Sequence, residues 1–184
     1  MNISHSKLTN WGLMHISIGR SFTILDIGCG GGATIAKLAA LAAEGRVYGI
    51  DYSLDSVGIS QRRNRKLIET GRVEIKHSSV SEMPFRDGMF DLVSAIETHY
   101  FWPNLPEDLK EVRRVLKPGG NLILMGGEYK GGKFDKRNAK WVELGNMTYH
   151  TLEELRRLLL KAGFLKVEVF EEYEQGWVCA VGGK

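Results

Sequence analysis

Residues 24–34 read I-L-D-I-G-C-G-G-G-A-T: an apolar run that contains one carboxylate, Asp26, followed by a cluster of glycines. The apolar run predicts a buried strand, and the glycines predict a tight turn into a helix that begins near Ala33. In an open parallel sheet the first strand-to-helix turn is the usual place where a ligand is held, because a backbone without Cβ atoms allows close approach. We therefore expect an α/β domain with a ligand site at this turn.

The other apolar runs alternate with longer segments of helical spacing. Runs of strand length recur at residues 22–27, 46–50, 73–76, 90–96 and 121–125. This alternation is typical of a doubly wound, mostly parallel sheet with helices on both faces. The runs at 167–170 and 177–181 are too close together for a parallel crossover, so we expect an antiparallel hairpin at the C-terminal edge of the sheet.

Several helix ends are marked in the sequence. Residues 106–116 have helical spacing, with a proline in the first turn and K-P-G-G at 117–120 as the stop. Thr151 and Glu154 predict a capping box at the start of the last helix. Glycines 45, 71 and 163 stand where helices should end, and glycine tolerates the left-handed conformation found there.

Length and composition predict one domain, residues 1–184, of ordinary globular character. Residues 1–20 predict a helical cover over the mouth of the sheet. Residues 127–150 predict an excursion on the substrate side, with five Lys and Arg residues between positions 130 and 140. A long excursion in a compact domain is usually functional or mobile. We interpret its charges as those of a solvated loop.

Charge and residue usage exclude several classes of partner. A formal net charge of +3 does not predict a nucleic-acid partner. The N-terminus does not resemble a signal peptide, and no apolar run approaches the ~20 residues that cross a bilayer, so we expect a cytoplasmic protein without a membrane partner. Cys29 and Cys179 have no C-x-x-C neighbour, and no cluster of acids and histidines has ligand spacing. We therefore expect reduced cysteines and no metal.

Two classes of cofactor fit the glycine turn. Gly28, Gly30 and Ala33 satisfy the dinucleotide pattern G-x-G-x-x-A, and Asp51 follows at the end of the second strand. Asp26 favours the other class, because a pyrophosphate brings negative charge to the turn, whereas S-adenosylmethionine carries a sulfonium and an ammonium. A second possible role for Asp26 is to accept backbone hydrogen bonds and shape the turn, and both roles are compatible.

Asp51 also has two interpretations. Its carboxylate can accept hydrogen bonds from both hydroxyls of an adenosine ribose, and it would repel a 2′-phosphate. Alone, it could equally cap the next helix. In combination with the glycine turn, the position favours the ribose.

Four segments, in this order and spacing, carry a family resemblance: I-L-D-I-G-C-G-G-G, V-Y-G-I-D-Y-S, M-P-F-R-D-G-M-F-D-L-V and E-V-R-R-V-L-K-P-G-G. Together they resemble a class I S-adenosylmethionine-dependent methyltransferase of the small-molecule type, over roughly residues 22–181. The resemblance implies a Rossmann-like, three-layer α/β/α fold with a seven-stranded sheet in the order 3-2-1-4-5-7-6. It also implies S-adenosylmethionine as the cofactor and S-adenosylhomocysteine as the product.

The same resemblance implies roles for particular residues. On the methionine and ribose side lie Asp26, Gly28, Cys29 and Gly30, with Asp51 on the ribose hydroxyls and Tyr52 beside the adenine. Ser79 and Val80 match the segment near the adenine amino group, and Ile96 and Glu97 match the support of the methionine end. Ser79 stands where the family often has an acid, and Gly31 where it often has threonine. The serine hydroxyl can still accept a hydrogen bond from the adenine amino group, but without the charge assistance of a carboxylate.

Residues 96–104, I-E-T-H-Y-F-W-P-N, follow the fourth strand and should project into the cleft. His99 is the candidate catalytic base, since a reference pKa near 6.5 suits proton removal at neutral pH; the alternative is a packed, structural histidine. The aromatic residues at 100–102 could form a wall of the acceptor site or belong to the core. We expect four further aromatic side chains to help cover the cleft: Trp11, His15, Trp141 and Tyr149.

The expected function is transfer of a methyl group from S-adenosylmethionine to a small-molecule acceptor. Neither an N-P-P-Y segment nor a Pro-Cys pair is present, which argues against methylation of nucleic-acid bases. The alternatives are an NAD-dependent oxidoreductase and a non-catalytic, S-adenosylmethionine-binding regulatory protein.

Overall fold

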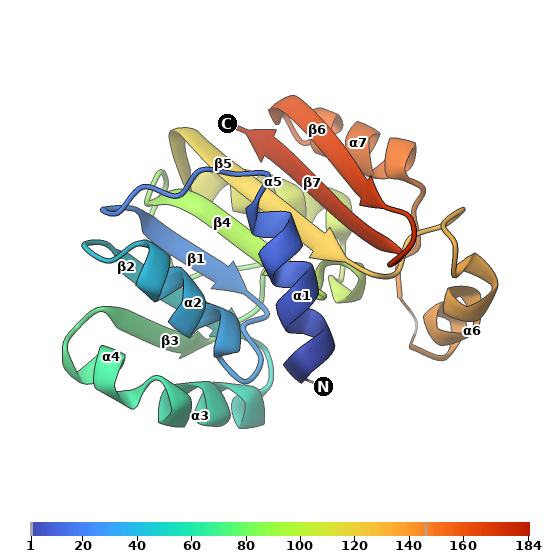
Figure 1. The fold of residues 1–184 in the computed structure, drawn as a ribbon. Helices are drawn as coiled ribbons and strands as arrows, with labels where there is room; N and C mark the ends of the chain where they lie inside the picture. The colour runs from blue at the N-terminus through green and yellow to red at the C-terminus, as the bar shows by residue number, and fades with distance from the viewer. Residues whose placement is uncertain (1, 146) are drawn as a thin grey trace.

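The computed structural model describes residues 2–145 and 147–184, and its centre is a seven-stranded sheet (Figure 1). The strand order is β3-β2-β1-β4-β5-β7-β6. The first five strands pair in parallel, and β7 lies antiparallel between β5 and β6. The predicted fold and the antiparallel hairpin are confirmed. The strands are β1 (Thr23–Ile27), β2 (Arg46–Asp51), β3 (Val73–His77), β4 (Phe90–Ile96), β5 (Leu116–Gly126), β6 (Leu165–Glu172) and β7 (Trp177–Gly183).

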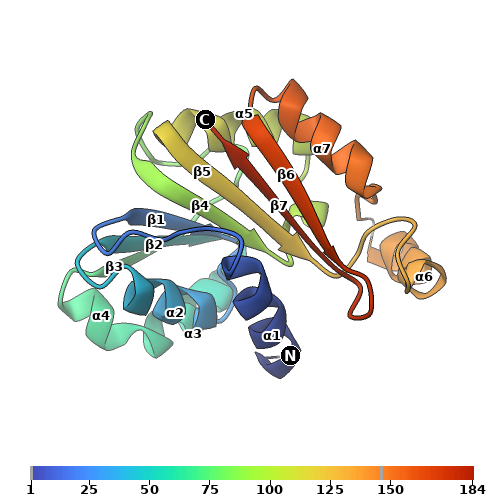
Figure 2. The same cartoon turned by 45° about the horizontal axis from the view of Figure 1, so that its top comes forward.

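Helices cover both faces of the sheet, which gives three layers (Figure 2). One face is covered by α1 (Asn2–Leu13), α2 (Ala33–Leu41), α3 (Leu54–Arg63) and α4 (Arg65–Glu69). The other face is covered by α5 (Leu105–Val115) and α7 (Leu152–Lys161). A 3₁₀ turn, η1 (His99–Phe101), follows β4, and α6 (Asp135–Gly145) lies beyond the end of β5, outside the two helical layers.

The strands of the sheet separate two hydrophobic clusters, because successive side chains of a strand point to opposite faces. In β1, Ile24 packs with α1 and α2, whereas Leu25 packs with α5 and α7; both are fully buried. Burial on both faces explains why the parallel strands are continuously apolar in the sequence.

The structure corrects three details. The K-P-G-G segment follows the end of α5 as expected, but it lies inside β5, which already begins at Leu116. Leu116 pairs with Phe90, and the pairing of β4 with β5 shifts in register between Phe90 and Leu92. Gly71 and Gly163 have φ of 70° and 92°, whereas Gly45 is not left-handed: a Cβ there would lie 1.9 Å from the Phe22 carbonyl oxygen. The 127–150 excursion contains helix α6, which its weak periodicity did not predict.

Candidate functional site

Three neighbouring parallel strands end together and bring the predicted motifs to one place. Ile27 is paired with Ile50 on one side and with Ala95 on the other. The residues that follow these three positions are Gly28, Asp51 and Ile96, so they meet at the carboxyl edge of the sheet. This is the edge at which open α/β sheets bind ligands.

A cavity of about 330 Å³ opens at this edge, between α1, α2 and the end of β4. Its volume is at the lower end of the range for small-molecule sites. Six residues predicted to bind the cofactor line it: Asp26, Gly28, Cys29, Gly30, Ile96 and Glu97. Gly31 and Ala33 of the glycine turn line it as well, together with four residues that no sequence pattern indicated: Ser6, Thr9, Thr34 and Lys37.

The glycine turn is built around backbone hydrogen bonds from β2. The amides of Gly28 and Cys29 both donate to the Ile50 carbonyl, at 2.8 and 3.0 Å. Gly28 has φ of 70°, and a Cβ there would lie 2.3 Å from Thr98 Oγ1. Gly30 has φ of 50°, and a Cβ there would meet open space. Glycine therefore sets the conformation at both positions and leaves the backbone of Gly30 accessible from the cavity.

Asp26 lines the cavity but is 2% exposed, and its carboxylate has no basic partner among the described residues. Ser94 Oγ donates to its Oδ1 at 2.7 Å. Burial raises the pKa of Asp26 to about 7, with the nearby Asp51 carboxylate adding to the effect and the Ser94 hydrogen bond opposing it. A buried acid that lacks a cation, beside a cavity, is chemically suited to a cationic ligand.

Asp51 has the turn-shaping role that was considered for Asp26. Its Oδ2 accepts the Gly30 amide at 2.8 Å, and its Oδ1 accepts the Ser53 amide at 2.9 Å. The next helix is capped by Ser53 itself, whose Oγ accepts the Ser56 amide. Asp51 is 7% exposed and does not line the cavity. A carboxylate has about four acceptor positions, so these two bonds leave capacity for ligand hydroxyls.

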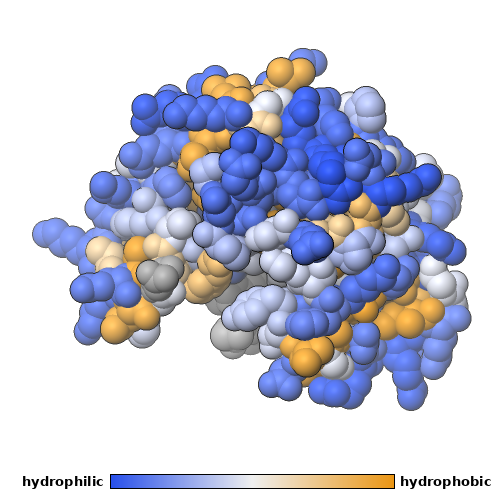
Figure 3. Space-filling model, turned by 180° about the vertical axis from the view of Figure 1, so that it is seen from behind, coloured by the Kyte–Doolittle hydropathy of each residue, from blue (hydrophilic) through white to orange (hydrophobic). Residues whose placement is uncertain are grey.

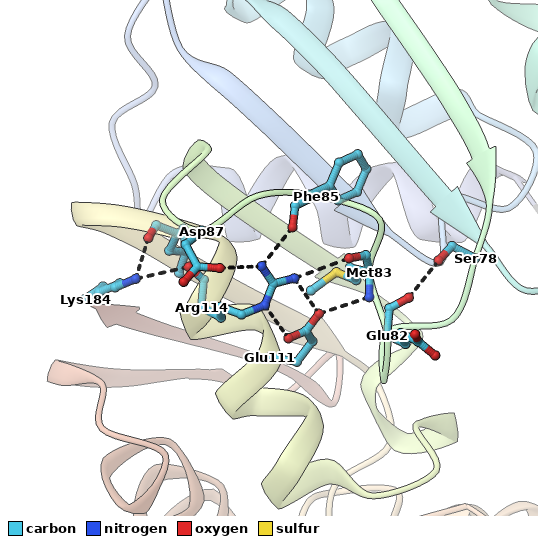
Figure 4. Close-up of polar contacts among 9 residues, drawn as sticks. Ser78, Glu82, Met83, Phe85, Asp87, Glu111, Arg114 and Lys184 are labelled. Carbon is cyan, nitrogen blue, oxygen red and sulfur yellow. Dashed lines mark hydrogen bonds and ion pairs between the residues drawn. The ribbon is translucent and has the colours of Figure 1, made fainter.

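The predicted adenine-side residues lie further out along the same edge. Tyr52 is 80% exposed, Ser79 is exposed, and Val80 is buried in the core. None of them lines the cavity. The segment that follows them, residues 82–87, is held by Arg114 of α5, whose guanidinium donates to the carbonyls of Met83 and Phe85 (Figure 4).

The residues after β4 and β5 bring two carboxyl groups together. Ile96 is paired with Met125, so Glu97 and Glu128 follow neighbouring strand ends. Tyr100 Oη donates to Glu97 Oε2, and Glu128 Oε2 is buried without a hydrogen-bond partner among the described residues. Burial and the Glu128 carboxylate raise the pKa of Glu97. Sequence reasoning missed Glu128, and only its position two residues after a strand end could have indicated it.

His99 lies in η1, is 5% exposed and does not line the cavity. Burial, together with the nearby His150, lowers the pKa of His99 to about 4. Its Nδ1 has no hydrogen-bond partner among the described residues. At neutral pH the imidazole is therefore uncharged. Tyr100 and Trp102 beside it are buried in the core, and Phe101 is 55% exposed.

None of the four aromatic residues expected to cover the cleft lines the cavity. Trp11 packs against Trp177, with ring centroids 6.0 Å apart, and His15 stacks on Phe170 at 4.0 Å. These contacts cover the β6–β7 hairpin. Trp141 is exposed on α6, and Tyr149 Oη donates to Asp135. The segment of α1 that does line the cavity is at Ser6 and Thr9.

The described residues contain no metal-ligand cluster of three or more His, Cys, Asp or Glu side chains. Burial raises the pKa of the Cys29 thiol to about 12, so it is not a nucleophile at neutral pH. No helix in the described ranges combines the length and hydropathy that a bilayer crossing needs.

A doubly wound sheet with an antiparallel last strand, a glycine turn and a buried acid at the carboxyl edge define a cofactor-binding α/β domain. Residues 25–124 match the family described as "Methyltransferase domain". The demethylmenaquinone methyltransferase of Bacillus cereus (strain AH187) is 30% identical over 168 residues, which cover 79% of this chain and 70% of that protein. The chain belongs to this family and is a class I S-adenosylmethionine-dependent methyltransferase.

Two further comparisons agree. The demethylmenaquinone methyltransferase of Bacillus mycoides (strain KBAB4) is 35% identical over 102 residues, and the match spans 55% of this chain but only 43% of that protein. The geranyl diphosphate C-methyltransferase of Streptomyces coelicolor A3(2) superposes with a TM-score of 0.81 at 18% identity, over 97% of this chain and 78% of the other. The family membership decides against the nicotinamide cofactor that the glycine pattern also allowed.

Proposed function

We propose that this protein transfers a methyl group from S-adenosylmethionine to a small-molecule acceptor, within the single domain formed by residues 1–184. The observation that carries the proposal is the buried carboxylate of Asp26, which borders the cavity without a basic partner. A bound sulfonium and ammonium would supply the missing positive charge. The named activity of the Bacillus relatives, on demethylmenaquinone, also concerns a small molecule.

In this proposal the two ends of the cofactor are held by different strand ends. Asp26, Gly28, Cys29 and Gly30 bind the methionine and ribose part, and Ile96 and Glu97 support the methionine end. Asp51 accepts the ribose hydroxyls, and Tyr52, Ser79 and Val80 surround the adenine further along the edge. The bound cofactor supplies an electrophilic methyl group on a positively charged sulfur.

We further propose that the acceptor lies beside the carboxyl pair of Glu97 and Glu128. The chain must mainly align the acceptor with the methyl carbon, since positioning alone is worth up to about 7–11 kcal/mol in such reactions. Where the acceptor atom carries a proton, an ionised member of the pair can take it. His99 stays a predicted base: its free Nδ1 is in its favour, and its low pKa and its absence from the cavity lining are against it.

The proposed function is tested in two steps. Isothermal titration of the full chain with S-adenosylmethionine, S-adenosylhomocysteine and NAD should show binding of the first two and none of the third. Labelled S-adenosylmethionine is then incubated with metabolite fractions that include demethylated quinols, and labelled products are identified by mass spectrometry. Cofactor binding without any labelled product from any fraction would favour the regulatory alternative.

Three variants separate the candidate bases. Glu128→Gln should lower kcat at least tenfold, whereas Glu143→Gln, an exposed acid of α6, should leave kcat unchanged. If His99→Gln produces the larger loss and shifts the pH profile, His99 is the base and the carboxyl pair is not.

A further inference from the structure

Helix α6 presents a face to solvent that combines positive charge with large apolar side chains. At 100° per residue, Lys136, Arg137, Lys140, Trp141 and Leu144 fall within one sector of the helix. All five are exposed, with Trp141 at 59% and Leu144 at 70%. We call this set the basic–aromatic face. On a helix of a globular protein, the apolar stripe normally faces the core.

The inner side of α6 explains why this face points outward. Asn138 is 2% exposed, and its Nδ2 donates to the Gly127 carbonyl at 3.0 Å. Asp135 accepts from Tyr149 Oη on the same side. The segment that returns toward α7 is fixed to η1, because the Thr148 amide donates to the Tyr100 carbonyl at 2.8 Å. These contacts fix the polar side of α6 against the domain.

The three cations of the basic–aromatic face form no ion pair with any carboxylate of the described residues. Lys133, just before the helix, is by contrast paired with Glu174. Arg137 lies over the ring of Phe134, with its Cζ 4.3 Å from the centroid, and its guanidinium donates to Asn138 Oδ1 at 3.3 Å. Both of these partners are uncharged. Their charge is therefore available to an external anion. Glu143, on the flank of the helix, is the nearest acid of α6 itself.

The face lies on a projecting part of the molecule. Figures 1 and 2 show α6 beyond the end of β5, outside both helical layers. From behind, hydrophobic and hydrophilic residues lie side by side on this projection, at the left of the view (Figure 3). Phe101, 55% exposed, lies beside the last residue of the helix, with its Cε1 3.8 Å from where a Cβ of Gly145 would be.

We propose that the basic–aromatic face of α6 docks on an anionic lipid bilayer surface. Such a surface accepts both kinds of side chain at once: Lys and Arg pair with anionic headgroups, and an indole ring with neighbouring apolar side chains enters the interface. A nucleic acid would use the cations and leave Trp141, Leu144 and Phe101 in water. The proposal departs from the expectation of no membrane partner, and it does not depend on which acceptor is methylated.

The test uses the full chain and sedimented vesicles, with no methyl transfer. Wild-type protein should partition onto phosphatidylcholine vesicles that contain phosphatidylglycerol, far less onto phosphatidylcholine alone, and less as salt rises. The triple variant Lys136→Ala/Arg137→Ala/Lys140→Ala should lose roughly a hundredfold in partition, since each cation near the surface contributes about a fivefold factor.

A matched control separates a specific face from net charge. The triple variant Arg62→Ala/Arg63→Ala/Lys66→Ala removes the same charge from exposed positions of α3 and α4. It should retain partition within about twofold of wild type, and all variants should keep the circular dichroism melting curve. Equal losses in the two triple variants would overturn the proposal.

Trp141 provides an independent readout. Its emission should shift to the blue on phosphatidylglycerol vesicles, and Trp141→Phe should abolish that shift, because the other tryptophans are partly or fully buried. No shift, or tighter binding to single-stranded RNA than to the vesicles with unchanged emission, would show that the face binds a different anion or none.

Discussion

Asp26 is an acidic side chain held in a buried environment that disfavours its charged form. An aspartate is normally ionised and solvated, but here it is 2% exposed with a serine hydroxyl as its hydrogen-bond partner. Burial disfavours the charged form, and the pKa rises to about 7. The folded protein therefore binds a proton that the unfolded chain releases at much lower pH. A cation bound in the cavity would offset this loss of stability.

This environment predicts a specific pH dependence of stability. Because the folded-state pKa is raised, the contribution of Asp26 is fully present below about pH 4 and is lost as the pH rises toward about 7. Asp26→Asn removes this dependence, so the variant should be more stable than wild type at pH 8 by about 2–4 kcal/mol and similar near pH 4. Urea unfolding at both pH values measures the difference.

The same variant should bind S-adenosylmethionine more weakly, and its affinity should no longer increase between about pH 6 and 8. Asp55→Asn, an exposed acid in the first turn of α3, is the control and should leave both properties near wild type. If Asp26→Asn is destabilising at pH 8 as well as at pH 4, the folded protein stabilises the ionised carboxylate and burial does not raise its pKa.

The segment 82–87 depends on one arginine of α5. Arg114 donates to Glu111 and Asp87 and to the carbonyls of Met83 and Phe85, while Glu111 also accepts the Met83 amide (Figure 4). The segment has no regular secondary structure of its own, so these side-chain hydrogen bonds hold it in place of the backbone hydrogen bonds of a helix or sheet. They fix the stretch that follows Ser79 and Val80 relative to the sheet.

Replacing Arg114 should therefore loosen this segment more than it destabilises the whole domain. Arg114→Lys cannot form the forked set of bonds, and we expect a loss of about 1–3 kcal/mol in the free energy of unfolding. Hydrogen exchange should accelerate at residues 82–87 in particular. The control is Lys110→Gln on the same helix, which breaks an exposed pair with Glu107 and should cost less than about 0.5 kcal/mol. Uniform acceleration across the chain would contradict a local anchor.

Both hydrophobic clusters are built on the same strands, one on each face of the sheet. Leu92 and Val93 are neighbours in β4, yet the first packs with α1–α4 and the second with α5 and α7. Neither layer of helices can separate without exposing one face of the sheet. The N-terminal helix joins the same unit, because Leu8 of α1 is 2% exposed in the cluster that contains Met125 and Cys179.

Unfolding should therefore be one cooperative transition of the full chain, as expected for a single domain. Urea curves followed by far-ultraviolet circular dichroism and by tryptophan fluorescence should have the same midpoint. Tryptophan fluorescence reports on both layers, because Trp11 and Trp177 pack in the cluster on one face of the sheet and Trp102 in the cluster on the other. Two separate midpoints would show that the layers unfold independently.

Much of this architecture could be predicted from local patterns. Alternating apolar runs, the glycine turn after residue 27 and the Thr151 capping box depend on neighbours in the chain, and the structure confirms each. The gathering of Gly28, Asp51 and Ile96 was also predictable, because parallel strands bring their carboxyl ends to one edge. Such features follow from short-range sterics and from the period of burial, which the order of residues specifies directly.

Contacts between distant segments required the folded chain. Asp51, not Asp26, holds the glycine turn, Glu128 meets Glu97, and Trp11 and His15 pack on the hairpin. The local sequence around each residue is compatible with several such partners. Which of these partners a residue contacts depends on the twist and register of the sheet and on how the helices pack on its faces. Those are properties of the packed molecule as a whole, and no local pattern encodes them.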